Sequence, residues 1–176
     1  MSEYYKADAT SRLQIRAVAK EIRNLFGLQN RFEFPIVEVF ETLSVCGEFN
    51  FEILTRAEMG NKYGETFPGK NQISLREDIY DKATAGDPFS RSTIAHELYH
   101  WLCHSDQTIS LCRTDADVEA RKPYEDPEWQ ANCFAGELLV PKDLVKGMSV
   151  EEVMEKCNVS RTMANYQLRK YREEEK

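Results

Sequence analysis

Histidine, glycine and proline are all scarce in this chain of 176 residues, which contains 3, 8 and 6 of them. Few glycines and prolines, with 41% hydrophobic and 30% charged residues, exclude a disordered chain. No apolar run approaches the roughly 20 residues of a transmembrane helix, and the first residues lack the apolar segment of a signal peptide. We therefore expect a soluble, cytoplasmic protein with one core domain and room for a small appendage.

Paired cysteines and excess positive charge are also missing. The 5 cysteines form no C-x-x-C pair, which argues against a zinc ribbon and a disulfide framework. Lys and Arg number 23 against 30 Asp and Glu, which gives a net charge of −7. Because phosphate neutralisation requires a basic face, this balance argues against direct DNA binding.

The few histidines lie together, all within residues 93–104. Residues 96–100 read H-E-L-Y-H, and on a helix His96 and His100 project about 40° apart and one turn apart. This is the spacing at which a helix supplies two imidazoles to a tetrahedral zinc ion. Glu97 projects about 60° further round, where it can hold a metal-bound water. Asp87-Pro88 provides the N-cap and first-turn proline that start such a helix.

A catalytic zinc ion also needs a third protein ligand and an open position. His104 lies about 12 Å along the helix axis from His96, so we interpret it as a helix-end residue or one that supports the ligands. The third ligand is then a carboxylate or a thiolate. Another helix begins at Asp126-Pro127, and Glu128 and Asn132 share one face of it. Glu128 fits a ligand accompanied by a supporting amide, but it also fits a first-turn acid favoured by the helix dipole.

Apolar periodicity predicts the surrounding elements. We expect two short strands, a turn-containing loop between them, and a long acidic connection that is either a lid or a mobile segment. The free edge of the small sheet either accepts an extended peptide or is covered by the next loop. The predicted helices span residues 10–26, 36–43, about 76–85, 149–156 and 160–173, the strands 49–54 and 72–75, the loop 57–69, and the acidic connection 105–125.

H-E-L-Y-H, followed 28 residues later by E-x-x-A-N-x-F-A-x-x-L-L-x-P, resembles the ImmA/IrrE family of metallo-endopeptidases over roughly residues 10–141. The resemblance implies a zinc peptidase in which His96, His100 and Glu128 hold Zn²⁺ and Glu97 is the catalytic base. Tyr99 stands where the family commonly has glycine, so we expect its bulk or its hydroxyl to alter the substrate cleft. With no histidine to spare, the donor to the oxyanion is a tyrosine or an arginine, and the tyrosine candidates are Tyr63, Tyr80, Tyr99 and Tyr124.

The predicted fold class is α+β. A mainly helical zincin-like domain with a small flanking β-sheet is expected over residues 1–144, and a helix-turn-helix-like helical segment packed on it over 145–176. The resemblance implies cleavage of a protein partner, typically a helix-turn-helix repressor of a phage, another mobile element or a stress regulon. The alternative is a non-proteolytic, zinc-stabilised anti-repressor or interaction protein, and the intact Glu97 favours the enzyme. For the C-terminal segment we favour packing or partner binding over DNA binding.

Overall fold

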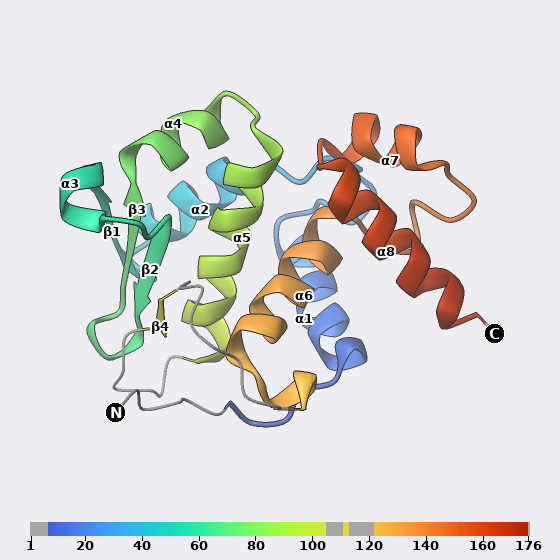
Figure 1. Cartoon of the computed structure of the whole chain (residues 1–176), viewed down its shortest axis with the longest axis horizontal. Coiled ribbons are helices and arrows are strands. Elements are labelled where there is room, and N and C mark those ends of the chain that lie inside the picture. Colours follow the sequence, from blue (N-terminus) through green and yellow to red (C-terminus); the bar gives the residue numbers. More distant parts are fainter. Residues whose placement is uncertain (1–6, 105–110, 113–121, 176) are drawn as a thin grey trace.

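Helix α5 (Pro88–Cys103) runs through the middle of the computed structural model, which describes residues 7–104, 111–112 and 122–175. The sheet lies on one side of α5, and helices α6 (Pro127–Leu139) and α1 (Arg12–Leu25) lie on the other (Figure 1). Because α5 is covered on both sides, its residues from Thr93 to His100 are all buried. The fold is α+β and mainly helical, as the sequence predicts.

The sheet has four strands in the order β1-β3-β2-β4. Strand β1 runs parallel to β3, and β2 runs antiparallel to both β3 and β4. The predicted strands over 49–54 and 72–75 are confirmed as β1 and β3. The strands span β1 Asn50–Leu54, β2 Gly64–Phe67, β3 Gln72–Arg76 and β4 Leu111–Cys112.

The predicted loop over 57–69 is wrong, because helix α3 (Arg56–Met59) and strand β2 occupy much of it. The sequence Gly-Glu-Thr-Phe of β2 has no apolar alternation, so its local pattern does not indicate a strand. Pairing with β3, together with burial of its first three residues, makes it one. At the other edge of β2, strand β4 pairs with Glu65 and Thr66, so a short strand rather than a loop covers this part of the edge.

The remaining predicted helices are confirmed, with bounds shifted by one or two residues. Serine side chains at positions 11, 149 and 160 cap three of them by accepting backbone N–H bonds. Most of the acidic connection over 105–125 lies outside the described residues. The remaining helices are α2 Ile36–Val45, α4 Glu77–Thr84, α7 Val150–Cys157 and α8 Arg161–Glu173, with short 3-10 turns η1 Pro68–Lys70 and η2 Pro123–Glu125. In the part of the chain that the structure describes, no helix is long and apolar enough to cross a bilayer.

A buried ion-pair cluster joins α1, α6 and the C-terminal helix α8. The Glu137 carboxylate of α6 lies 2.7 Å from Arg12 Nε and 2.7 Å from Arg16 Nε, and its side chain has no exposed surface. The Tyr171 hydroxyl of α8 lies 3.1 Å from Glu137 Oε2 and 2.6 Å from the carbonyl oxygen of Val140. These contacts place α8 beside α6 at a fixed position, while the division of the chain at residue 144 stays a prediction.

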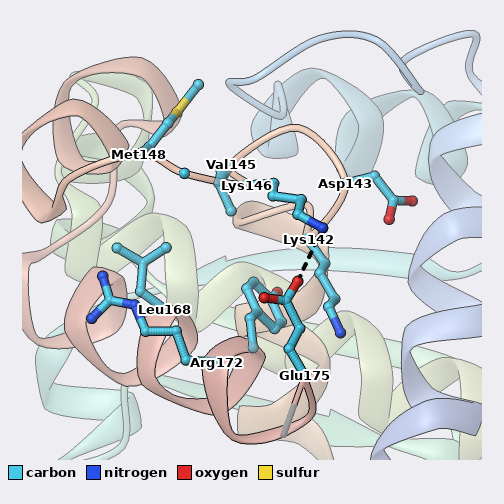
Figure 2. Close-up of a pocket in the computed structure, with 10 residues that line it drawn as sticks. Lys142, Asp143, Val145, Lys146, Met148, Leu168, Arg172 and Glu175 are labelled. Carbon is cyan, nitrogen blue, oxygen red and sulfur yellow. Dashed lines mark ion pairs between the residues drawn. The ribbon is translucent and has the colours of Figure 1, made fainter.

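The connection between α6 and α7 folds against α8 and encloses a small pocket there. Figure 2 shows this pocket, in which apolar Val145, Met148 and Leu168 are accompanied by charged residues. Lys146 Nζ lies 3.4 Å from Glu175 Oε1, so two of these charges offset one another. Val145 and Leu168 also belong to the main hydrophobic core, which therefore continues from α5 and α6 into the C-terminal helices.

We expect Glu137→Ala to lower the free energy of unfolding by up to about 3–5 kcal/mol, because the Arg12 and Arg16 guanidinium groups lose their fully buried carboxylate and keep only the partly exposed Glu174. Equilibrium urea denaturation measures this change. The matched control is Glu155→Ala on the exposed face of α7, for which we expect a change within about 0.5 kcal/mol. Equal stability of the two variants would contradict the anchoring role of Glu137.

Candidate metal centre

Two N-capped helices place the candidate ligands. In α5 the Asp87 carboxylate accepts a 2.8 Å bond from the Ser90 N–H, so the helix starts where the sequence predicts. His96 and His100 then lie one turn apart, both fully buried. In α6 the Asp126 carboxylate accepts a 3.0 Å bond from the Glu128 N–H, which sets Glu128 in the first turn. Packing of α5 on α6 brings this carboxylate to the two imidazoles.

The three predicted ligand side chains converge on one point. His96 Nε2 and His100 Nε2 are 3.0 Å apart, and Glu128 Oε2 and Oε1 lie 3.2 and 3.1 Å from them. Donor atoms about 2.0–2.1 Å from a tetrahedral zinc ion lie about 3.3 Å from one another. Both the donor types and their spacing therefore fit a zinc-sized ion. The Glu128 side chain is 34% exposed, which leaves the site open to solvent on that side.

The charge of Glu128 is maintained in this setting. Burial acts to raise the pKa of Glu128, but the neighbouring His100 and His96 side chains outweigh burial and hold this pKa well below its ordinary value. An ionised carboxylate is the form that binds a metal ion. At neutral pH the three side chains thus offer one anionic and two imidazole donors.

Strand β2 holds the carboxylate of Glu97. The Thr66 hydroxyl lies 2.8 Å from Glu97 Oε2 and 3.1 Å from the Glu97 carbonyl oxygen. Gly64 lies so close that a Cβ atom there would stand 2.6 Å from Glu97 Cγ. A side chain at position 64 would therefore displace the carboxylate. Sequence reasoning missed both residues because it interpreted their segment as a loop.

Residues 50–169 match the family model Peptidase_M78, described as an IrrE N-terminal-like domain, and this range is more than half of the chain. The chain belongs to this family. Membership identifies a metallopeptidase-like domain with a protein substrate, and the cluster of His96, His100 and Glu128 indicates a metal ion. The match extends into α8 as far as residue 169, beyond the end of the resemblance noted from the motifs. The comparison with curated proteins finds no match to this chain.

Hydrogen bonds behind the cluster determine which nitrogen of His100 carries a proton. Gln130 Nε2 donates to the carbonyl oxygens of Asp8 and Tyr124, at 2.8 and 2.9 Å. Its Oε1 is therefore an acceptor, and His104 Nε2, 3.0 Å away, carries the proton. Burial lowers the pKa of His104 to about 4, so this side chain is neutral and accepts at Nδ1 from His100 Nδ1, 3.0 Å away. His100 Nε2 keeps its lone pair, as metal binding requires.

His96 has a comparable partner on α6. Its Nδ1 lies 3.1 Å from Asn132 Oδ1, so an amide one turn after Glu128 contacts a candidate ligand, which confirms the expectation for Asn132. His104 contacts His100 from behind, which agrees with its interpretation as a supporting residue. Gln130 was missed, although it lies two residues after Glu128 and is almost fully buried. A buried glutamine near a histidine cluster is the signal that could have identified it.

The tyrosines proposed as oxyanion donors differ in their surroundings. Tyr99 is 1% exposed and packs on Phe134, so the expectation that it alters the substrate cleft of this family member is wrong. On α5 it projects into the core against α6, where a large apolar ring adds to the packing. Tyr80 is hydrogen-bonded to Glu41, which raises its pKa to about 12. Tyr63 directly precedes Gly64, and its ring lies 5.1 Å from that of Phe89 at the start of α5.

Proposed function

We propose that this chain is a zinc-dependent endopeptidase that cleaves a specific protein partner in the cytoplasm. In this proposal His96, His100 and Glu128 hold the ion, and Glu97 is the general base. The observation that carries it is the convergence of three donor atoms within 4.8 Å of one another, next to a buried carboxylate held by Thr66. A purely structural zinc site has no need of such a carboxylate, so the arrangement favours catalysis over the anti-repressor alternative.

In the proposed hydrolysis, different residues of the chain have different roles. When bound, the ion supplies a Lewis acid that polarises the scissile carbonyl and lowers the pKa of water. Glu97 accepts the proton of the attacking water and later delivers it to the leaving amine. The Thr66 hydroxyl donates a hydrogen bond to Glu97 Oε2 and so holds the carboxylate of the proposed base in place. Gly64 allows β2 to approach closely enough for that bond to form.

The partner that we propose is a helix-turn-helix repressor of a mobile element or stress regulon, as the family resemblance implies. Proteolysis of the repressor would relieve repression. The net charge of −7 supports a protein partner over DNA, because it gives no general attraction to phosphate. Direct binding of DNA by α7 and α8 is therefore not part of the proposal.

The test is a search for new protein termini. Zinc-loaded wild-type chain, zinc-loaded Glu97→Gln and wild type with a chelator are each incubated with cytoplasmic protein from the source cell, and new amino termini are sequenced. We expect new termini from one or a few proteins, a DNA-binding repressor among them, in the first sample alone. The same termini in all three samples, or none in the first, would contradict the proposed activity. Termini only from proteins of other classes would contradict the proposed partner.

The hydrogen-bond chain behind His100 gives a separate prediction. We expect Gln130→Leu to weaken zinc binding by about 10–100-fold, because His104 and then His100 lose the partner that fixes their tautomers. Competition with a chromophoric chelator measures the affinity. The control is Gln72→Leu on β3, which removes a glutamine that bonds to Glu52 instead. An unchanged affinity in Gln130→Leu would show that these bonds do not orient His100.

A further inference from the structure

A groove of about 570 Å³ lies between the start of α5, one face of α6 and the first turns of α8. Its volume falls within the roughly 300–1,000 Å³ of clefts that bind small ligands and side chains. Figure 1 shows α8 alongside α6, on the side of the molecule away from the sheet. The C-terminal segment therefore forms one wall of the groove. The lining residues used below are Phe89, Ser92, Trp129, Asn132, Met163 and Tyr166.

The groove adjoins the candidate metal centre at Asn132. Asn132 lines the groove, and its Oδ1 lies 3.1 Å from His96 Nδ1. Trp129 follows Glu128 directly in α6, and Ser92 precedes His96 by one turn of α5. A group bound beside Asn132 would therefore lie close to His96, one of the three candidate ligands.

The lining of the groove selects for an apolar group. Phe89 is 42% exposed and Tyr166 is 37% exposed, although large aromatic side chains normally bury more of their surface. The half-buried Met163 also lines the groove, and methionine adapts its shape to different apolar ligands. Among the described residues that line the groove, none carries a formal charge. Exposed aromatic and methionine side chains next to a reactive centre are typical of a binding surface.

We propose that this groove binds an aromatic or long aliphatic side chain of the protein substrate, next to the bond that is cleaved, and that α8 supplies the specificity-determining wall through Met163 and Tyr166. The proposal rests on the proposed function, because it names what the same site selects. It gives the C-terminal helix a role in recognising the substrate. It also gives a role to a helix-turn-helix-like segment that lacks excess positive charge and packs on α6 beside the groove.

Binding and cleavage are measured separately, so that each proposal can fail alone. Trp101→Phe leaves Trp129 as the single tryptophan, because the chain contains 2, and places the fluorescent reporter in the groove. In this background, zinc-loaded Glu97→Gln is titrated with unstructured decapeptides that differ only at one central residue: Phe, Leu, Ala or Asp. We expect Phe and Leu peptides to bind at least about tenfold more tightly than Ala or Asp peptides.

Substitutions on α8 then test which residues produce the preference for Phe over Ala peptides. Met163→Asp and the milder, more exposed Tyr166→Asp should remove the discrimination between Phe and Ala while keeping the wild-type zinc content. The matched control is Val45→Asp, which changes an 88% exposed apolar residue at the end of α2, away from the groove. It should keep the discrimination. Circular dichroism of each variant identifies any loss of folding, and Tyr166→Asp retains the test if Met163→Asp unfolds.

The outcomes distinguish the two proposals. If both α8 variants lose the discrimination between Phe and Ala peptides, the groove proposal is supported. If, in addition, the chain with intact Glu97 cleaves no peptide, the peptidase proposal fails alone. Equal binding of all four peptides, or discrimination that both variants retain, overturns the groove proposal. Cleavage of all four peptides at equal rates by the chain with intact Glu97 would also overturn it, and would leave the peptidase proposal in place.

Discussion

Glu97→Gln lowers the rate of proteolysis by at least about 10²–10⁴-fold, the usual contribution of a general base, while the zinc content stays at the wild-type value. Glutamine has nearly the same shape as glutamate and keeps a polar atom for the Thr66 hydroxyl, but it cannot accept the proton of water. The measurement is the cleavage rate of the partner identified by its new termini, together with elemental analysis of the same samples.

The matched control for Glu97→Gln is Glu33→Gln. Glu33 also loses a charge in this substitution, but its carboxylate pairs with Arg91, at 2.8 Å, away from the three candidate ligands. We expect its cleavage rate to stay within about a factor of two of wild type, as is usual for substitutions that leave the reacting groups in place. Full activity in Glu97→Gln would contradict the role of Glu97 as base and would favour another proton acceptor.

Glu128→Ala removes the zinc ion under conditions in which the wild type retains about one ion per chain. Two imidazoles one turn apart then remain without the anionic donor, and the loss of affinity should exceed the roughly 10–100-fold effect of residues that only orient a ligand. His96→Ala should have the same effect. Elemental analysis after dialysis against a weak chelator measures the bound zinc.

The control for Glu128→Ala is Glu77→Ala. Glu77 is an exposed acid in the first turn of α4, so it has the helix-dipole setting of Glu128 without the neighbouring histidines. Glu77→Ala should keep its zinc. Retention of zinc in both variants would show that Glu128 is only a favourable first-turn acid, and the third ligand would have to be sought elsewhere.

Much of the candidate site could be predicted because its parts are local in the sequence. The relation of His96 to His100 follows from helix geometry alone, and the N-caps at Asp87 and Asp126 fix where both helices begin. The position of Asn132 relative to Glu128 follows from the same periodicity. Only the choice of Glu128 as the partner of the histidines needed the family resemblance, because spacing along α6 does not tell which helix lies beside it.

The parts that could not be predicted depend on contacts between distant segments. Strand β2 lacks a strand pattern and exists through its pairing with β3 and β4, so the support of Glu97 by Thr66 was invisible in the sequence. Tyr99 was expected to alter the substrate cleft because it stands where the family commonly has glycine. The packing of α5 against α6 turns it into the core instead.

The sequence by itself determined which side chains each helix presents as candidate ligands, since their positions on each helix are set by periodicity and caps within a few residues. The tertiary structure decided what surrounds them: the strand that holds Glu97, the glutamine that fixes the tautomer of His104 and His100, and the groove bounded by α8. The reason is physical. Helix geometry is fixed by bonds between residues four apart, whereas pairing, burial and grooves depend on which distant surfaces meet when the core forms.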